Sequence, residues 1–225
     1  MVSMKEKITC EHLILCEGED EKQFLIAYLN STERKKDDPR FESSVQVWNF
    51  GGNEQLKNGL TVISNTEGFS NLKTILIMRD AEADVFKAEK QIKAALSANA
   101  LPVPLEQGVW SEIGVPFTAY LLFPSLGKGN KNGTLEHLCM ELIKDEFAPE
   151  LILPKISEFM SGLEKDHLRQ FKHNFKSKIH SFISMTDPFV GLKIGEAARA
   201  GAFDWNNPAL TGLNSCLIEG FNKER

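Results

Sequence analysis

The sequence predicts an α/β protein with a mostly parallel sheet of about four strands, flanked by helices and followed by a helical C-terminal part. Short apolar runs of the kind found in buried parallel strands recur in the first half of the chain. A helical pattern separates each run from the next, and such alternation implies right-handed crossovers. After about residue 150 no convincing strand pattern follows. Together these observations give the fold class.

Each element has its own signal along the chain. The first strand ends in Leu13-Ile14-Leu15-Cys16, and the clearest one begins with Thr74-Ile75-Leu76-Ile77-Met78. We expect strands at 8–16, 45–50, 74–78 and 115–123. We expect helices after residue 20, around 56–63, at 85–96, from 134 onwards, and near 155–163, 167–185, 192–200 and 208–221. Thr134 is the expected N-cap of the helix that it opens.

The bulk composition is that of an ordinary globular chain. Of 225 residues, 42% are hydrophobic and 25% charged. The formal net charge of −5 argues against a general nucleic-acid coat, although it allows one basic groove because steering depends on local charge. The first seven residues are polar and lead to no secretion signal, and no apolar run approaches the roughly 20 residues of a membrane span. The four cysteines form no CxxC pair, so we expect reduced side chains and a cytoplasmic protein.

Acidic residues follow two of the predicted strands. Glu17 ends the first strand, with Glu21 one helical turn later, whereas Asp80, Glu82 and Asp84 follow the third. Ligands of open parallel sheets bind at the carboxyl ends of the strands, where these groups would converge. The sequence therefore predicts an acidic cluster at one edge of the sheet.

Convergent carboxylates need a counterion or protons. Two unit charges about 4 Å apart repel by roughly 4 kcal/mol at an effective dielectric constant near 20. Hard oxygen ligands with few histidines favour Mg²⁺ or Mn²⁺. A plainer interpretation is that the acids cap helices and loops, as Asp84 would do for the helix after it.

These acidic segments resemble the motifs of TOPRIM domains. Residues 13–21 are similar to the first motif, a strand followed by Glu-Gly, and residues 75–84 are similar to the second, usually Asp-x-Asp. Gly133-Thr134-Leu135-Glu136 resembles a later Gly-x-Leu-Glu motif, and Lys176 and Lys178 resemble a late lysine motif. The likeness is closest to the domains of the overcoming-lysogenisation-defect (OLD) nucleases and to short stand-alone proteins of the TOPRIM type.

The resemblance implies a Rossmann-like TOPRIM core at 1–150 and a helical extension at 151–225 packed on it. It implies a Mg²⁺-dependent nuclease of phage defence or DNA repair. The implied metal ligands are Glu17, Glu21, Asp80, Glu82, Asp84 and Glu136, and the implied catalytic residues are Glu17, as ligand and general base, with Lys176 and Lys178. The implied partner is nucleic acid, DNA in the first place; a separately encoded ATPase and a second copy of the chain are further candidates.

The sequence also departs from the family pattern. The second acid of Asp-x-Asp is Glu82 here, which alters the expected coordination. Tyr28 and Tyr120 fit apolar patterns, so no tyrosine nucleophile of the topoisomerase type is expected, and no Walker A motif occurs. A non-catalytic module that binds a metal–nucleotide, nucleic acid or an ATPase partner therefore stays open as the alternative.

Basic residues recur later in the chain at helical spacing. Lys165, Arg169, Lys172 and Lys176 would share one face of a helix, with Phe175 and other apolar residues on the opposite, buried face. Such a face is typical of a solvated amphipathic helix, and it also suits a surface that tracks phosphates. Lys128 and Lys131 would extend that nucleic-acid-binding surface.

Overall fold

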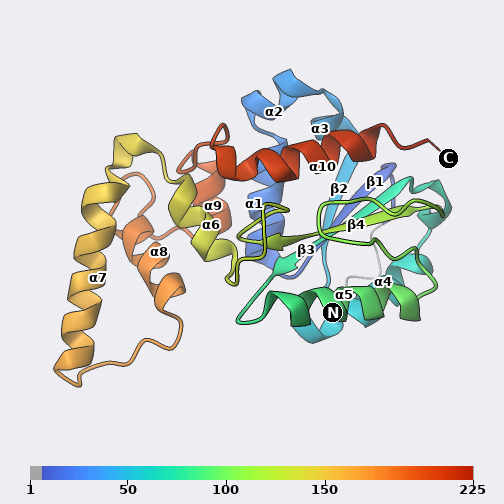
Figure 1. Cartoon of the computed structure of the whole chain (residues 1–225). Helices are drawn as coiled ribbons and strands as arrows, with labels where there is room; N and C mark the ends of the chain where they lie inside the picture. Colours follow the sequence, from blue (N-terminus) through green and yellow to red (C-terminus); the bar gives the residue numbers. More distant parts are fainter. Residues whose placement is uncertain (1–6, 225) are drawn as a thin grey trace.

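Four parallel strands form the centre of the molecule. The computed structural model describes residues 7–224, so most of the predicted polar start, residues 1–6, lies outside the described part. The strands are β1 (His12–Cys16), β2 (Val45–Asn49), β3 (Thr74–Asp80) and β4 (Phe117–Phe123). They pair in the order β2-β1-β3-β4, each neighbouring pair parallel (Figure 1). The predicted α/β fold class with a parallel sheet is confirmed.

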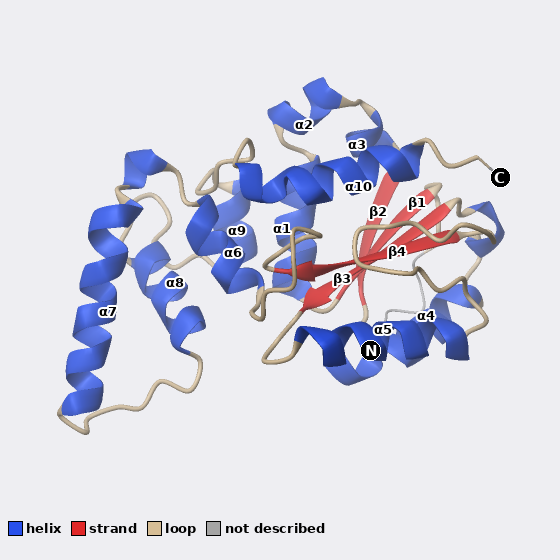
Figure 2. Cartoon of the chain, in the orientation of Figure 1, coloured by secondary structure: helices blue, strands red, loops and turns tan. Residues whose placement is uncertain are grey.

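Helices surround the sheet and form most of the C-terminal part (Figure 2). The α-helices are α1 (Glu19–Leu29), α2 (Thr32–Asp37), α3 (Arg40–Ser43), α4 (Leu56–Ser64), α5 (Val85–Ala98), α6 (Leu135–Leu142), α7 (Pro149–Lys165), α8 (Asn174–Ser184), α9 (Ile194–Arg199) and α10 (Thr211–Phe221). Short 3₁₀ helices lie at Asn53–Gln55, Phe69–Asn71, Asp145–Phe147 and Pro208–Leu210. No helix within residues 7–224 is both long enough and apolar enough to cross a membrane.

The sheet separates two hydrophobic clusters, because side chains alternate between the two faces of a strand. In β1, Leu13 and Leu15 belong to the cluster under α4 and α5, whereas Ile14 and Cys16 belong to the cluster under α1, α6, α9 and α10. All four side chains are essentially inaccessible to solvent. The continuous apolar runs of the sequence thus reflect a sheet that is covered on both faces.

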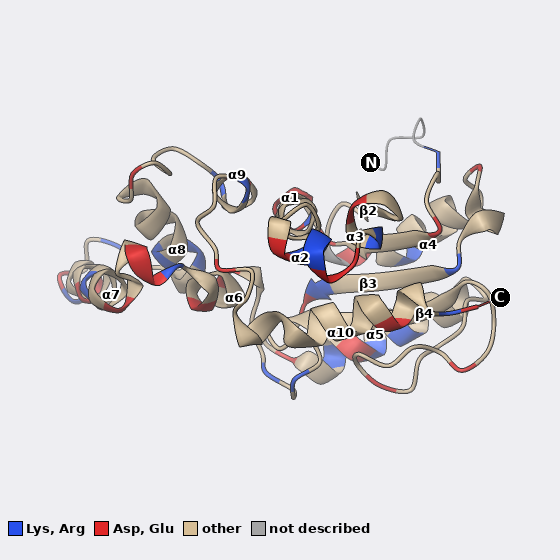
Figure 3. Ribbon diagram, turned by 90° about the horizontal axis from the view of Figure 1, so that it is seen from above, with Lys and Arg blue, Asp and Glu red and all other residues tan. Residues whose placement is uncertain are grey.

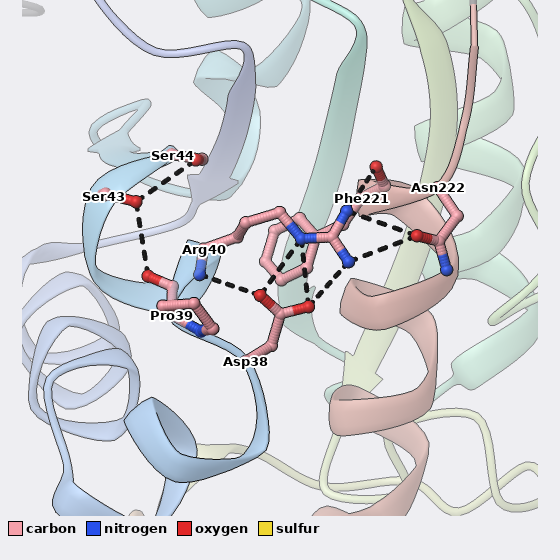
Figure 4. A network of polar contacts seen from close by, with 7 residues as sticks. All are labelled: Asp38, Pro39, Arg40, Ser43, Ser44, Phe221 and Asn222. Atoms are coloured by element: carbon pink, nitrogen blue, oxygen red, sulfur yellow. Dashed lines mark hydrogen bonds and ion pairs between the residues drawn. The ribbon is translucent and has the colours of Figure 1, made fainter.

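The C-terminal helices contribute to the same core as the strands. Leu213, Leu217 and Phe221 of α10 belong to the cluster on the α1 side of the sheet. Arg40 fastens the end of α10, because its guanidinium pairs with Asp38 and donates to the Phe221 carbonyl at 3.0 Å (Figure 4). The division at residue 150 stays a prediction, while the helical character of the C-terminal part is confirmed.

Several predicted elements have different bounds in the structure, among them the first strand and the helix predicted at 167–185. The first strand begins at His12 rather than residue 8, since the backbone N–H groups of Thr9 and Cys10 donate to the Gln46 side chain instead of a neighbouring strand. The predicted helix at 167–185 is wrong in its first part. Helix α7 ends at Lys165, residues 166–173 form a loop, and α8 begins only at Asn174.

Candidate functional site

Glu17 and Asp80 lie at the same edge of the sheet, at the ends of adjacent parallel strands. Asp80 is the last residue of β3, and Glu17 directly follows β1. A turn after β2 fixes the backbone there: Gly51 and Gly52, both at positive φ, donate their N–H groups to the Glu17 carbonyl at 3.1 and 3.0 Å. The predicted arrangement, two acidic strand ends at one edge, is therefore present.

Asp80 is the most deeply buried acid of this edge. It is 9% exposed, and its Oδ1 accepts the backbone N–H of Leu135, at the start of α6, at 2.8 Å. Burial, followed by the charge of Glu21, raises the pKa of Asp80 to about 9. The carboxylates of Glu136 and Glu17 also contribute to this increase, whereas the Leu135 hydrogen bond opposes it. Four carboxylates thus act on one another at this point.

Glu21 turns back toward the start of its own helix, α1. A Cβ added to Gly18 would meet the Glu21 Oε2 at 2.8 Å, so the absence of a side chain at Gly18 makes room for this carboxylate. Burial is the largest cause that raises the pKa of Glu21, and Glu17 and Glu136 also raise it. Glu21 is thus part of the same acidic cluster as Glu17 and Glu136.

Glu136 reaches the same edge from α6. Thr134 is the N-cap residue, as predicted, and its hydroxyl donates to the Glu136 Oε2 at 2.6 Å. The Lys176 Nζ lies 3.8 Å from the Glu136 Oε1. The first turn of α6 therefore presents an oriented carboxylate with a cation beside it.

The remaining two predicted metal ligands have different surroundings. Glu82 is exposed, has φ of 56°, and exchanges two backbone hydrogen bonds of 2.8 Å with Gly133. Asp84 is exposed and caps α5 by accepting the Lys87 N–H at 3.1 Å. The capping interpretation therefore describes Asp84 better than a ligand role, whereas Glu82 stays near Asp80 in the pocket described below.

Arg79 belongs to the site, although the sequence interpretation gave it no role. It is 1% exposed, its Nε lies 3.9 Å from the Glu17 Oε2, and it donates to Gln91 of α5 at 3.2 Å. Burial lowers the pKa of Arg79, and the charge of Glu17 opposes that change. An arginine directly before Asp80 in an otherwise apolar strand was the signal available in the sequence.

The predicted basic stripe is wrong as a helical face. Lys165 ends α7, Arg169 and Lys172 lie in the loop, and only Lys176 is in α8. Helix α8 lies beside α6 (Figure 3). Lys128 instead donates to the carbonyl of Pro208 at 2.6 Å. Two further predicted residues are placed as follows: Lys131 is exposed in the loop before α6, and the Lys178 Nζ lies 5.7 Å from the Phe175 ring centre.

An open pocket of about 510 Å³ connects the acidic edge with the start of α8. Its lining comprises Asp80, Glu82, Asn132, Gly133, Thr134, Glu136, His137, Lys172, His173, Asn174, Phe175 and Lys176. Acidic and basic residues thus line the same pocket. Lys172 and Lys176 meet here although no single helix carries them with Lys165 and Arg169.

The donor set suits a hard cation. The crowded groups are carboxylates, and burial, together with the charges of neighbouring acids, raises the pKa of Asp80 and of Glu21. Mg²⁺ typically takes one or two carboxylates and keeps several waters. Within residues 7–224, no group of three or more His, Cys, Asp or Glu side chains is arranged to hold a metal ion. The residues fit a cation held by few carboxylates better than a cage made by protein alone.

The fold and the site define an α/β protein with a carboxylate-rich pocket at the carboxyl edge of a parallel sheet. Residues 11–222 match the model of a family described as a protein of unknown function, DUF3226. The chain belongs to this family. No curated protein and no solved structure was found to be similar to it.

Proposed function

We propose that the acidic edge binds Mg²⁺ or Mn²⁺ and that the protein cleaves phosphodiester bonds of nucleic acid, DNA in the first place. The observation that carries this proposal is Asp80, a buried acid whose pKa rises to about 9 beside three other carboxylates. It lines a pocket that also contains Lys172 and Lys176. The resemblance of the acidic segments to TOPRIM motifs supports the same chemistry.

Each residue has a defined task in this proposal. Asp80 and Glu136, which both line the pocket, would hold the cation, with Glu21 and Glu17 as neighbouring negative charges. The Leu135 N–H and the Thr134 hydroxyl orient two of these carboxylates. The bound cation would supply Lewis acidity at a phosphate oxygen.

Lys176 provides positive charge in the pocket, beside the acid Glu136. Its Nζ lies 3.8 Å from the Glu136 Oε1, and because its side chain is 56% exposed it is accessible to a phosphate. A cation positioned where negative charge develops stabilises a transition state. Lys176 would thus neutralise the phosphate group that the carboxylates alone would repel.

A plasmid-cleavage assay tests this function. The purified protein is incubated with supercoiled plasmid and with circular single-stranded DNA in Mg²⁺, Mn²⁺ or EDTA. We expect cleavage only with a divalent cation, and at least about 100-fold slower cleavage by Asp80→Asn, since even outer-shell changes at metal sites lower affinity or activity by 10–100-fold. Asp84→Asn is the matched control, because Asp84 caps a helix and asparagine is an equally good cap. Cleavage by Asp80→Asn or Glu17→Ala at the parent rate would refute the proposal.

A second candidate is a non-catalytic module that binds a metal–nucleotide, nucleic acid or a separately encoded ATPase. The specific observation behind it is Glu82, which replaces the usual aspartate and is exposed on a left-handed backbone. Binding without turnover in the same assay would favour this candidate.

All four cysteines are free, which supports the proposal of a reducing, cytoplasmic location.

A further inference from the structure

Phe175 is an exposed aromatic residue in the pocket of the acidic edge. The sequence pattern placed it on a buried helix face, and that prediction is wrong: Phe175 is 43% exposed. It lies in the first turn of α8 and lines the same pocket as Asp80 and Glu136. The ring of Phe175 is therefore accessible to a ligand that enters this pocket.

His137 holds the Phe175 ring in place. The two ring centres are 3.7 Å apart and the ring planes differ by 32°. The His137 Nδ1 in turn accepts the backbone N–H of Thr134 at 3.1 Å. The aromatic pair is thereby fixed to the N-terminus of α6, whose Glu136 is part of the acidic cluster.

Basic side chains surround this ring. Lys172, His173 and Lys176 line the pocket with Phe175, and the Lys178 Nζ lies 5.7 Å from its ring centre. Proteins that bind single-stranded nucleic acid combine a positively charged groove for the backbone with aromatic side chains on which bases stack. The base of a duplex is already stacked within the helix and is not available for such a contact.

Phe159 is also an exposed aromatic residue, but its surroundings differ from those of Phe175. It is 67% exposed on α7, and it lines a different groove with Ile152, Ile156 and Met185. The acids of the sheet edge are absent from the residues that line that groove. Phe175 differs because its neighbours are suited to phosphates and to a cation.

We propose that Phe175 stacks on an unpaired base, and that the site therefore takes single-stranded nucleic acid rather than duplex. This inference rests on the proposed function in placing a phosphate between the acidic edge and the lysines. In this arrangement Lys172 and Lys176 contact the backbone on either side of the stacked nucleotide. Phe175 is thus a specificity-determining residue, and His137 is a positioning residue behind it.

Binding of a cleavage-resistant oligonucleotide tests the inference. The probe is a fluorescein-labelled 12-nucleotide DNA with phosphorothioate linkages, single-stranded or annealed to its complement, and dissociation constants are measured by anisotropy in Mg²⁺. We expect Phe175→Ala to weaken single-strand binding by roughly 5- to 150-fold, the range of one lost base–aromatic stack. Phe175→Trp should restore binding and show tryptophan fluorescence that the single strand quenches. Phe159→Ala is the matched control and should bind like the parent.

The outcomes separate this inference from the proposed function. If Phe175→Ala binds the single strand like the parent, or if it loses single strand and duplex equally, the stacking role is refuted even if the protein cleaves DNA. If Phe175→Ala weakens single-strand binding selectively but the parent cleaves nothing, the stacking role stands and the cleavage proposal falls. If the parent binds neither probe, both are refuted. Unchanged melting temperatures of the variants confirm that each is folded.

Discussion

The two ends of strands β1 and β3 differ in how their buried polar groups are compensated. At the amino ends, His12 and Thr74 form one hydrogen bond of 2.8 Å, and burial lowers the pKa of His12 to about 4, which keeps the imidazole neutral. At the carboxyl ends, burial and neighbouring acids raise the pKa of Asp80 to about 9. A neutral, paired group stabilises the fold, whereas a crowd of acids destabilises it unless a ligand compensates. This difference in compensation is the reason to place the proposed functional site at the carboxyl end of the sheet.

The largest expected effect is at Asp80. The pKa of Asp80 in the folded protein lies above the ordinary value of 3.8. Between about pH 4 and 9 the folded protein therefore keeps a proton on Asp80 that the unfolded chain has already released. Stability from this group is present at low pH and is lost as pH rises toward 9. We expect Asp80→Asn, which keeps the acceptor for Leu135, to stabilise the cation-free protein by about 3–5 kcal/mol at pH 8.

Thermal unfolding in EDTA at several pH values measures this effect. The difference in melting temperature between Asp80→Asn and the parent should increase from pH 5 to pH 8. Added Mg²⁺ should raise the melting temperature of the parent more than that of the variant, because a ligand of the folded state stabilises it. A variant that is less stable than the parent at pH 8 would show that the buried carboxyl group of Asp80 does not destabilise the cation-free protein.

Arg79 should give the next largest effect. Its guanidinium is 1% exposed and lies 3.9 Å from Glu17, so Arg79→Met removes a buried countercharge. Loss of one partner of a buried pair destabilises by about 3–5 kcal/mol. Urea denaturation should show this loss, and the double variant Glu17→Gln/Arg79→Met should be less destabilised than the sum of the single variants. Additive effects would mean that the two charges do not act together.

His12 tests the amino end of the comparison. Its folded-state pKa of about 4 lies below the ordinary 6.5, so the unfolded chain takes up a proton first when the pH falls. Stability from this group is present above pH 6.5 and is lost between pH 6.5 and 4, by about 3 kcal/mol. His12→Asn keeps a polar partner for Thr74 but does not titrate. Its stability should therefore fall less steeply over this range, and an unchanged slope would exclude His12 as the cause.

The smallest stability effect is expected at Lys176. Its ion pair with Glu136 is 3.8 Å long and 56% exposed on the lysine side, and such pairs contribute about 0–1 kcal/mol. Lys176→Ala should unfold within about 0.5 kcal/mol of the parent in urea, yet cleave DNA more slowly in the plasmid assay. Lys165→Ala, at the end of α7, is the control that should change neither. A large loss of stability in Lys176→Ala would give this residue a structural role instead.

The sequence was informative where a local pattern determines structure. Buried parallel strands produce continuous apolar runs, so β1 and β3 and the acids that end them could be predicted from their own residues. The common edge followed because parallel strands present their carboxyl ends on the same side. The N-cap at Thr134 was also a local property.

Other features depend on contacts between distant segments. The spacing of Lys165, Arg169 and Lys172 fits a helix, yet no charge pattern reveals that His167 turns the chain at φ 55° and ends α7. Arg79 could not be assigned without knowing that it meets Glu17 from another strand. Phe175 has the spacing of a buried residue, and only its position above His137 shows that it faces the pocket region.

The return of α10 to the first strands has a consequence for folding during synthesis. Phe221 packs 5.0 Å from His12 and 5.2 Å from Phe41, ring centre to ring centre. Strands β1 to β4 leave the ribosome well before this helix does, so the part of the α1-side face that α10 covers stays exposed until residue 221 has emerged. Such surfaces are where chaperones bind and where partly made chains aggregate. The core on the α1 side of the sheet is therefore complete only after α10 has been synthesised.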